Sequence, residues 1–366
     1  MTTILLAVFL VFAAINLTYF LLFFRFASGN NPPATASAIP VSIIICAKNE
    51  AQNLNNFLPS ILEQEYQDFE VILINDASVD ETLEVMEKFQ RIDGRIQIVN
   101  VENNETFWAN KKYALTLGIK KARYQHLLFT DADCVPQSKH WIHEMSGKFH
   151  DEKSIVLGYG GYFKNKSSLL NKLIRFETLL TAIQYFSYAK LGMPYMGVGR
   201  NLAYTSKQFY QQNGFATHLH LRSGDDDLFV NEGATEENTA ICYEHKGVTR
   251  SVPKKSFTRW IIQKRRHVSV AGNYRKKHKV LLGLFYISQV LLWFLFALLA
   301  FTRFWQFSLI VFAVVLIIKG ILYFKAAEKL DEKDVVWLFP IMELFLITTQ
   351  FGIFIANIIS KPTHWK

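Results

Sequence analysis

Hydrophobic and polar positions follow two alternating periods along residues 41–131. Continuous β-branched and aliphatic runs, such as VSIIICA at 41–47, predict strands that are buried on both faces of a parallel sheet. Between these runs, apolar residues recur at helical spacing, as they do in 54–62. This alternation predicts a doubly wound, Rossmann-like α/β domain. Strands are expected within 41–50, 69–76, 96–101 and 126–133, and helices within 50–66, 77–92 (capped by Ser78 or Asp80) and 109–122.

Longer apolar segments lie at both ends of the chain. Residues 2–24 carry no charge and are long enough, as a helix, to cross a hydrocarbon core of about 30 Å. The alternative is a cleavable signal peptide, but no basic region precedes the segment and no clear small-x-small cleavage site follows it. The pattern therefore favours a retained anchor, and 280–301, 307–324 and 337–359 predict three further spans.

Several polar side chains fall inside the predicted spans, among them Lys319, Glu343 and Gln350. Lys319 is near the end of its span, so we expect its ammonium group to snorkel to the membrane interface. Glu343 and Gln350 are expected to face neighbouring helices, because unpaired polar groups are costly in hydrocarbon.

Basic residues predict the orientation. Arg25 follows the first span and YRKKHK at 274–279 precedes the second, so the region between them is expected in the cytosol. Four spans would then place both termini on the outer side. The chain is thus predicted to be an integral protein of a bacterial-type inner or plasma membrane.

Composition adds two constraints. The three cysteines, Cys46, Cys134 and Cys242, are odd in number and widely spaced, which agrees with a reducing compartment and not with a disulfide framework or a zinc site. The net charge of +9 is concentrated in 254–279 and suits anionic headgroups or phosphate better than nucleic acid. The predicted division is an anchor (1–25), a linker (26–40), a cytosolic α/β domain (41–253), a basic interfacial helix segment (254–279) and about three membrane helices (280–366).

Candidate chemistry begins with LLFTDADCVP at 127–136, where an apolar run ends in Asp131 and Asp133. Residues i and i+2 of an extended segment share one face, and two ionised carboxylates repel unless a cation lies between them. Oxygen ligands suit Mg²⁺ or Mn²⁺, and a phosphate-bearing substrate would complete the site. The alternative is a D-x-D turn with Asx capping, which is as plausible for the motif taken alone.

The other predicted strands also end in polar residues. Ligands bind outside the carboxyl ends of the strands in doubly wound sheets, so these residues are expected at one ligand site. They are Lys48, Asn49 and Glu50 after the first strand and Asn75 and Asp76 after the second.

Four motifs in order resemble the family-2 glycosyltransferases of GT-A fold, the group that includes cellulose, hyaluronan and ceramide-glucoside synthases. VSIIICAKNEAQNL is similar to the opening strand of that family, VILINDASVDET to DDxSxDxT, NKKYAL to GKxxAL and FTDAD to DxD. Asn75 departs from the pattern, because it stands where the first aspartate of the pair is usual. The resemblance covers about 40–270 and implies that a nucleotide-sugar is bound by Ala47, Lys48, Asn49, Glu50, Asp76, Lys111, Asp131 and Asp133, with Asp133 and Asp131 at the metal.

A later motif bears on the catalytic base. SGDDDLFVN at 223–231 resembles EDxDL, with Gly224 where glutamate is usual, which implies that Asp225 is the base. Asp226 is the close competitor. The alternative is an acidic N-cap for a helix that begins near Leu228.

Two further segments are expected near the diphosphate and the acceptor. WIIQKRRH resembles QxxRW at Gln263 and Arg266, with His267 in place of tryptophan; the alternative is an amphipathic helix that meets lipid headgroups. PYMGVGRNLAYTS is similar to the acceptor-side segment of the family and offers Arg200 and Asn201.

Taken together, the residues and the resemblance predict an inverting, Mg²⁺- or Mn²⁺-dependent hexosyltransferase. A nucleoside-diphosphate sugar, expected to be UDP-linked, is the predicted donor, and a lipid-linked or amphiphilic molecule at the cytosolic membrane face is the predicted acceptor. One alternative is a processive polysaccharide synthase. A second is a non-catalytic membrane module that binds nucleotides or partners.

Overall fold

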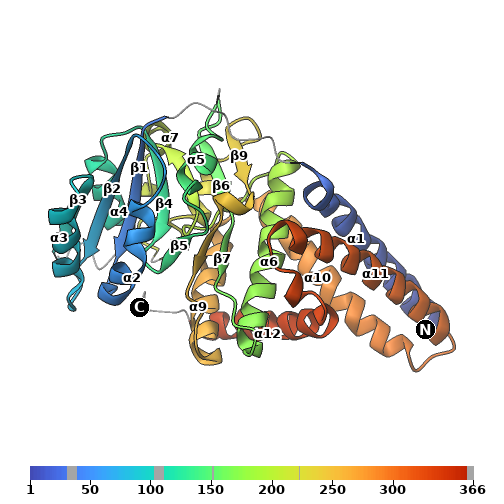
Figure 1. Cartoon of the computed structure of the whole chain (residues 1–366). Helices are drawn as coiled ribbons and strands as arrows, with labels where there is room; N and C mark the ends of the chain where they lie inside the picture. The colour runs from blue at the N-terminus through green and yellow to red at the C-terminus, as the bar shows by residue number, and fades with distance from the viewer. Residues whose placement is uncertain (31–38, 103–110, 151, 222, 361–366) are drawn as a thin grey trace. The chain divides into compact units, whose positions relative to one another are not determined.

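A computed structural model describes residues 1–30, 39–102, 111–150, 152–221 and 223–360 (Figure 1). The chain divides into two compact units. We call the first the helical unit; it is formed by Met1–Asn30, Asn165–Leu191 and Lys255–Pro362. The second, the α/β unit, is formed by Asn31–Lys164 and Gly192–Lys254, together with the last four residues.

The α/β unit is built on a seven-stranded sheet with the order β3-β2-β1-β4-β8-β6-β9. Strands β3, β2, β1 and β4 are parallel, whereas β8 is antiparallel to both of its neighbours. The bounds are β1 Val41–Ala47, β2 Phe69–Asp76, β3 Ile96–Val101, β4 His126–Asp131, β6 Ile155–Gly158, β8 Leu202–Thr205 and β9 Thr239–Cys242. A small second sheet joins β5 Cys134–Pro136, β10 Thr249–Ser251 and β7 Gly160–Tyr162.

The predicted alternation of strands and helices is confirmed. The helices that follow β1, β2 and β3 are α2 Ala51–Leu62, α3 Thr82–Ile92 and α4 Lys111–Lys121, and the later ones are α5 Trp141–Ser146, α7 Ser206–Gln211 and α8 Asp227–Gly233. Of the two expected caps, Asp80 accepts a hydrogen bond from the backbone N–H of Thr82 (3.1 Å), at the start of α3. Ser78 instead accepts a bond from the backbone of Asn49.

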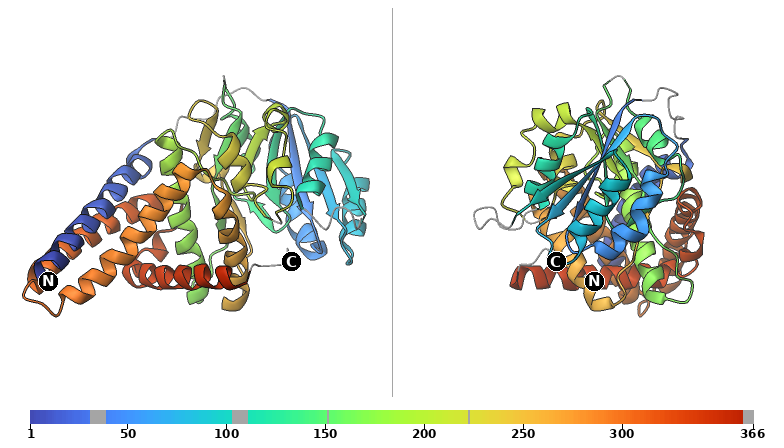
Figure 2. Two further views of the ribbon diagram at one scale, coloured as in Figure 1. Left: turned by 180° about the vertical axis from the view of Figure 1, so that it is seen from behind. Right: turned by 60° about the vertical axis from the view of Figure 1, so that its left-hand side comes forward.

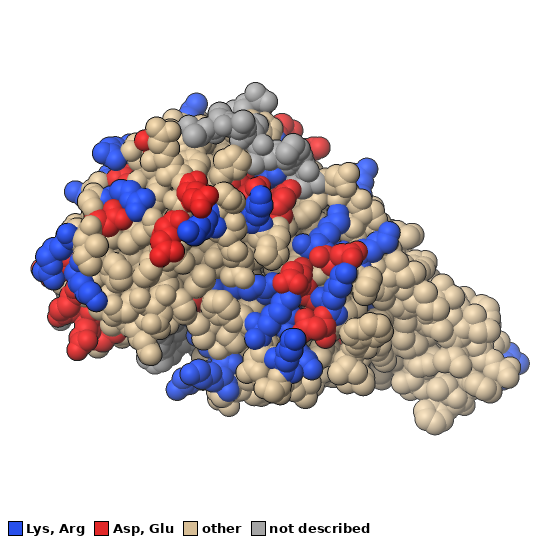
Figure 3. All heavy atoms as spheres, in the orientation of Figure 1, with Lys and Arg blue, Asp and Glu red and all other residues tan. Residues whose placement is uncertain are grey.

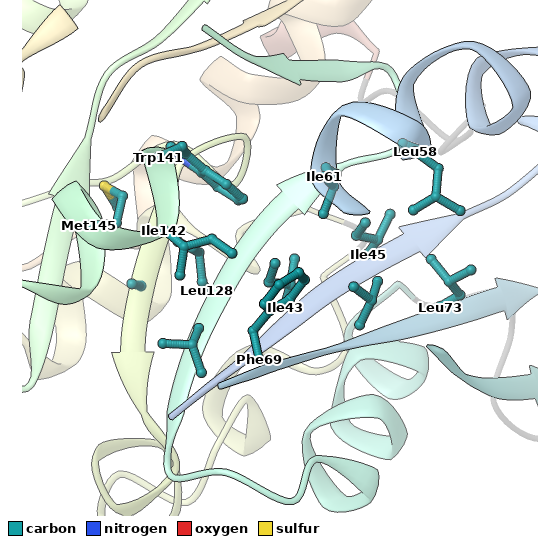
Figure 4. Packing of buried hydrophobic residues seen from close by; sticks show 14 of the residues in the cluster. Ile43, Ile45, Leu58, Ile61, Phe69, Leu73, Leu128, Trp141, Ile142 and Met145 are labelled. Carbon is teal, nitrogen blue, oxygen red and sulfur yellow. The ribbon is translucent and has the colours of Figure 1, made fainter. Parts of the chain in front are cut away.

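The core of this unit lies where the central strands meet α2 and α5 (Figure 4). Leu58 and Ile61 of α2 pack there with Trp141 and Met145 of α5, and all four are 0–2% exposed. Every residue of β1 and β2 is buried, as continuous apolar runs predict for parallel strands covered on both faces. This packing holds the carboxyl ends of the strands at one edge.

The helical unit contains six long helices: α1 Thr2–Ser28, α6 Leu169–Lys190, α9 Phe257–Val270, α10 Lys276–Leu299, α11 Trp305–Lys329 and α12 Phe339–Ile359. Four of them, α1, α10, α11 and α12, are long and apolar enough to cross a membrane, as predicted. Helices α1, α10 and α11 lie side by side, whereas α12 runs at an angle to them (Figures 1 and 2). The face that α1, α10 and α11 present in Figure 3 carries almost no charged side chains, which suits contact with lipid.

The prediction that the Lys319 ammonium group reaches the membrane interface is wrong. Its side chain is fully buried and donates hydrogen bonds to Gln289 of α10 and Glu343 of α12, the latter at 2.8 Å. A buried carboxylate on a neighbouring helix removes the reason for the ammonium group to reach the interface. Glu343 faces a neighbouring helix as expected, whereas Gln350 is exposed.

Helix α6 is tied into the helical unit by an ion-pair network. The fully buried Arg175 binds Glu332 (2.5 Å) and Asp334 (2.5 Å), both in the segment between α11 and α12. Burial lowers the pKa of the guanidinium, but the two carboxylates outweigh it and raise the pKa overall. Residues 165–191 thus pack with the apolar helices, although they lie between two segments of the α/β unit in the sequence.

Candidate active site

Lys111 joins two carboxylates that are far apart in the sequence. Its Nζ lies 3.1 Å from Asp131 Oδ1 and 3.0 Å from Asp225 Oδ2. Lys111 begins α4, Asp131 ends β4, and Asp225 lies just before α8. The α/β sheet therefore brings together one cation and two of the predicted acidic residues.

The charges of this cluster determine its protonation. Burial would raise the pKa of Asp225, but the charge and hydrogen bond of Lys111 lower it overall. Burial also lowers the pKa of Lys111, and here the two carboxylates prevail and raise it. At neutral pH, Asp225 is consequently a carboxylate held by an ammonium ion.

Asp226 has a different environment from Asp225. One of its oxygens accepts the backbone N–H of Gly199 (2.7 Å), and the other accepts that of Asp227 (2.8 Å), at the N-cap of α8. Burial and the charge of Asp225 raise its pKa. The capping role considered for the acidic run thus applies to Asp226, which leaves Asp225 as the residue that faces Lys111.

Gly224 explains one departure from the family pattern. Its φ is +96°, and a Cβ at this position would lie 2.6 Å from the side chain of Leu228. A glutamate would be strained in this left-handed conformation and would also clash. Glycine is therefore required by the turn that presents Asp225.

A small cavity opens between these groups. It is lined by Lys111, Asp131, Asp225 and Asp226, all of which were predicted site residues. Sequence reasoning did not select several other lining residues, which lie within the quoted motifs and reach the cavity because β1, β4 and β8 are neighbours. Those with polar or reactive side chains are Cys46, Thr130 and Tyr204.

Asp133 lies beside Asp131 in a cluster that fits a divalent cation. Ligand atoms of Asp131, Asp133 and Cys134 all lie within 4.8 Å of one another. Burial, together with the charges of Asp131 and Glu50, raises the pKa of Asp133 to about 6. Burial also raises the pKa of the Cys134 thiol, which stays protonated and donates to Asp133 Oδ1 (3.4 Å). The carboxylate oxygens are thus the available ligands, and they are hard donors of the kind that Mg²⁺ and Mn²⁺ prefer.

Arg200 supplies positive charge near these carboxylates. Its guanidinium donates to Gly160 O (2.8 Å) and lies over the ring of Tyr162 (4.3 Å). Its Nε is buried and has no hydrogen-bond partner among the described residues. A group with a free, buried N–H donor is suited to an anionic ligand.

The side chain of Asn201 forms hydrogen bonds with other residues of the α/β unit. Its amide nitrogen donates to Tyr159 O (2.9 Å) and Gly247 O (2.8 Å), and its amide oxygen accepts Trp141 Nε1–H (3.0 Å). The residue is fully buried. We therefore assign Asn201 to the support of the site rather than to contact with the acceptor.

The predicted nucleotide residues lie at the ends of β1 and β2. Cys46 of β1 is in register with Asp131, and Ala47 with Asn75, so the segments meet at one edge. Asp76 is 2% exposed, and its Oδ2 has no hydrogen-bond partner among the described residues. Burial raises its pKa, while the charges of two nearby lysines oppose that shift. Asp76 therefore offers an unused acceptor at this edge.

The turn after β1 is held by the loop after β2. Asn49 has φ of +55°, and its Oδ1 accepts the backbone N–H of Val79 (2.9 Å). The backbone N–H of Glu50 donates to Thr82 Oγ1 (2.8 Å). Asn49 and Glu50 are thus held in place by the loop after β2 and the start of α3, and not by the local sequence alone.

Asn75, which departs from the family pattern, has a hydrogen-bond partner on β3. Its amide nitrogen donates to Asn100 Oδ1 on β3 (2.7 Å), and its Oδ1 accepts the backbone N–H of Ser78 (3.2 Å). The sequence contained no signal for the pair, because Asn100 belongs to an unremarkable strand. An asparagine at position 75 satisfies both groups, whereas an aspartate could not donate to Asn100.

Lys112 was also missed by sequence reasoning. Its Nζ donates to the carbonyl oxygens of His218 (2.7 Å), Leu221 (3.1 Å) and Ser223 (2.8 Å). Burial lowers its pKa to about 8. Lys112 thus holds the backbone that leads into the acidic run, whereas its neighbour Lys111 lines the cavity.

Gln263 and Arg266 lie on α9 in the helical unit, and their roles stay predictions. Their neighbour Arg265 binds the end of α12, through Asn357 Oδ1 (3.0 Å) and the carbonyl oxygens of Ala356 and Ser360. Arg265 is therefore engaged in helix packing.

Part of the chain is similar to proteins of known family. Residues 42–215 match the profile of the family described as glycosyl transferase family 2. A poly-beta-1,6-N-acetyl-D-glucosamine synthase of Staphylococcus aureus (strain COL) is 27% identical over 169 residues, which is 45% of this chain and 40% of the relative. The Staphylococcus epidermidis synthase of that name is 30% identical over 137 residues, 37% of this chain and 32% of the relative. In both comparisons, the similarity spans less than half of this chain and less than half of the relative.

A solved structure of a mannosyltransferase from Pyrobaculum calidifontis, in complex with GDP-Man and Mn²⁺, has a similar fold. Its TM-score is 0.61 at 18% identity, over 90% of this chain and 98% of that chain. This similarity of fold supports the expected GT-A fold, and it extends over 90% of this chain. Residues 42–215 therefore resemble the family-2 glycosyltransferases, in a chain whose apolar helices precede and follow the α/β domain in the sequence.

Proposed function

We propose that the protein transfers a sugar from a nucleoside-diphosphate sugar to an acceptor hydroxyl, with inversion at the anomeric carbon. One observation carries the proposal: Lys111 holds Asp131 and Asp225 at the strand edge where Asp133 also lies. A purely structural cluster would not need so many half-buried carboxylates at the ligand-binding edge of a doubly wound sheet.

Asp225 is the proposed base. The acceptor oxygen attacks the anomeric carbon, its proton passes to the Asp225 carboxylate, and the bond to the diphosphate breaks with its electron pair on the leaving group. Asp226 keeps the turn in place through its two backbone bonds. Lys111 and Arg200 supply positive charge for the diphosphate, and Asp76 accepts from the nucleotide base.

Asp133 and Asp131 would hold Mg²⁺ or Mn²⁺. A bound divalent cation would neutralise charge on the departing diphosphate. The raised pKa of Asp133 supports this assignment, because burial and the charges of Asp131 and Glu50 disfavour its ionised form and a bound cation would offset them. The Pyrobaculum calidifontis structure holds Mn²⁺ together with its nucleotide-sugar.

The acceptor is proposed to be lipid-linked or amphiphilic, because the chain carries four helices apolar enough to cross a membrane. We retain the predicted division, with the α/β domain at 41–253 on the cytosolic side. Gln263 and Arg266 are proposed to lie near the diphosphate or the acceptor. The proposed donor is UDP-linked. The names of the staphylococcal relatives favour a second candidate, a processive polysaccharide synthase.

Donor turnover and product length test both candidates. Full-length protein in vesicles is supplied with Mn²⁺, membrane lipid extract and each of a panel of UDP-sugars and GDP-Man, and release of the nucleoside diphosphate is measured. A single-sugar transferase yields one discrete glycolipid, whereas a processive synthase yields chains that lengthen with time. No release with any donor, from protein that retains its fold, would instead favour the non-catalytic module.

Metal affinity is expected to depend on pH through Asp133. A metal ligand must be deprotonated, so a carboxyl with a pKa of about 6 begins to lose Mn²⁺ below pH 6. An ordinary aspartate would do so only below about pH 4. Calorimetric titration with Mn²⁺ between pH 5 and 8 should show the dissociation constant rising by up to about tenfold per unit below pH 6. A constant affinity down to pH 5 would contradict the assignment.

Orientation is tested by cysteine labelling. The three native cysteines are buried, so wild-type protein should react little with a membrane-impermeant maleimide. Arg303→Cys, exposed between α10 and α11, should react in intact cells, whereas Lys88→Cys, exposed on α3, should react only after the membrane is permeabilised. The reverse pattern would place the α/β domain outside.

A further inference from the structure

The helical unit contains a cavity of about 180 Å³ that the proposed chemistry does not use. All its lining residues belong to this unit, on α1, α6, α9, α10, α11 and α12. The volume exceeds the roughly 150 Å³ of an engineered apolar cavity that binds benzene. It suits the head and first carbons of a lipid rather than a whole molecule.

Most of the wall is apolar, with Phe20, Phe23 and Phe285 among the aromatic contributors. Gln350 also lines the cavity and is exposed on α12, so the cavity reaches the surface there. The flanks of α12 carry exposed apolar side chains, including Phe345 (42%) and Phe351 (55%). An occupant with hydrocarbon chains can therefore continue from the cavity onto an apolar helix surface.

Two polar groups in the wall have unused hydrogen-bonding capacity. Trp260 of α9 is 1% exposed, and its Nε1 has no partner among the described residues. Glu343 of α12 is 2% exposed; its Oε1 binds Lys319, but its Oε2 has no partner among those residues. A buried donor and a buried acceptor without partners each carry a desolvation cost that a ligand can offset.

The charged side chains of the wall, together with Lys319 behind it, determine the kind of head group. Glu343 is paired with Lys319 (2.8 Å), and Glu177 is paired with Lys264. The two lysines and two glutamates sum to zero formal charge. A phosphate would have to displace a carboxylate from its lysine, whereas a neutral hydroxyl can use Trp260 N–H and Glu343 Oε2 without breaking either ion pair.

We propose that this cavity binds a lipid with an uncharged, hydroxyl-bearing head group. Its hydroxyl donates to Glu343 Oε2, and an oxygen of the head accepts from Trp260 Nε1. The proposal does not rest on glycosyl transfer, since binding is measured without a donor. Conversely, a failure of the proposed enzymatic activity would leave this binding unaffected.

The test uses full-length protein in nanodiscs of dioleoyl phosphatidylcholine, whose head group has no hydroxyl. Dioleoylglycerol and dioleoyl phosphatidic acid share their chains and differ in the phosphate, so each is added in turn and the bound lipid is counted by native mass spectrometry. We expect about one dioleoylglycerol per chain, raised thermal stability, and weaker retention of phosphatidic acid. Equal or preferred binding of phosphatidic acid would overturn the neutral head group.

Variants locate the binding. Trp260→Phe removes the N–H and keeps most of the ring, and it should weaken dioleoylglycerol binding about five- to tenfold. Trp293→Phe is the matched control, because the Trp293 N–H also has no partner among the described residues but Trp293 is not among the lining residues. Binding to Trp293→Phe should equal wild type. Equal affinity in wild type and Trp260→Phe, or an equal loss in the two variants, would overturn the site.

A second variant fills the space. Thr349→Phe adds an aromatic ring at a lining position of α12 and should abolish retention of the lipid. The variant is informative when its melting temperature without lipid stays close to wild type; if it unfolds, Trp260→Phe still decides the question. Undiminished binding in folded Thr349→Phe would contradict the proposal.

Discussion

Asp225→Asn is expected to lower the turnover number about 10²–10⁴-fold while the protein stays folded. The amide is nearly isosteric with the carboxylate but cannot accept the acceptor proton. Lys111 keeps its contact with Asp131, so the cavity retains one of its two ion pairs. Initial rates of nucleoside diphosphate release, measured at saturating donor, check the prediction, with donor affinity measured separately.

Asp226→Asn is the matched control. It keeps one of the two acceptors that hold Gly199 and the start of α8, so one backbone N–H loses its partner and stability should fall by about 1–3 kcal/mol. Turnover by the folded fraction should fall far less than in Asp225→Asn. If Asp226→Asn instead abolishes turnover and Asp225→Asn does not, the two assigned roles are exchanged.

Asp133→Asn is expected to lower activity on the order of 100-fold and to remove most of the response to Mn²⁺. The physical reason is the loss of one anionic oxygen ligand beside Asp131. Because burial and like charges disfavour the Asp133 carboxylate, the variant should be at least as stable as wild type without metal. Thermal unfolding with and without Mn²⁺ should thus show a metal-dependent rise in wild type that is absent from the variant.

Asp93→Asn serves as the control for charge removal. Asp93 pairs with Arg95 in the turn between α3 and β3, and this pair is partly exposed. Its loss should leave the Mn²⁺ dependence unchanged. An equal loss of metal response in Asp93→Asn would show that the effect of Asp133→Asn is not local.

The sequence predicted the place of Asp131 but could not distinguish Asp225 from Asp226. The position of Asp131 at a strand end followed from the apolar run before it, and its pairing in space with other strand ends followed from the parallel topology. The acidic run at 225–227 left the base ambiguous, because neighbouring aspartates have equal local chemistry. The structure separates them through partners from elsewhere: Lys111 at Asp225, and Gly199 at Asp226.

The sequence by itself determined the alternating strands and helices, the apolar spans and the family motifs, since each of these is a periodic or contiguous pattern along the chain. Only the tertiary structure placed α6 with the apolar helices, paired Lys319 with Glu343 and engaged Asn201 internally. These features depend on contacts between residues distant in sequence, which depend on how whole elements pack. A local pattern shows that a polar residue needs a partner, but only the packed fold supplies that partner.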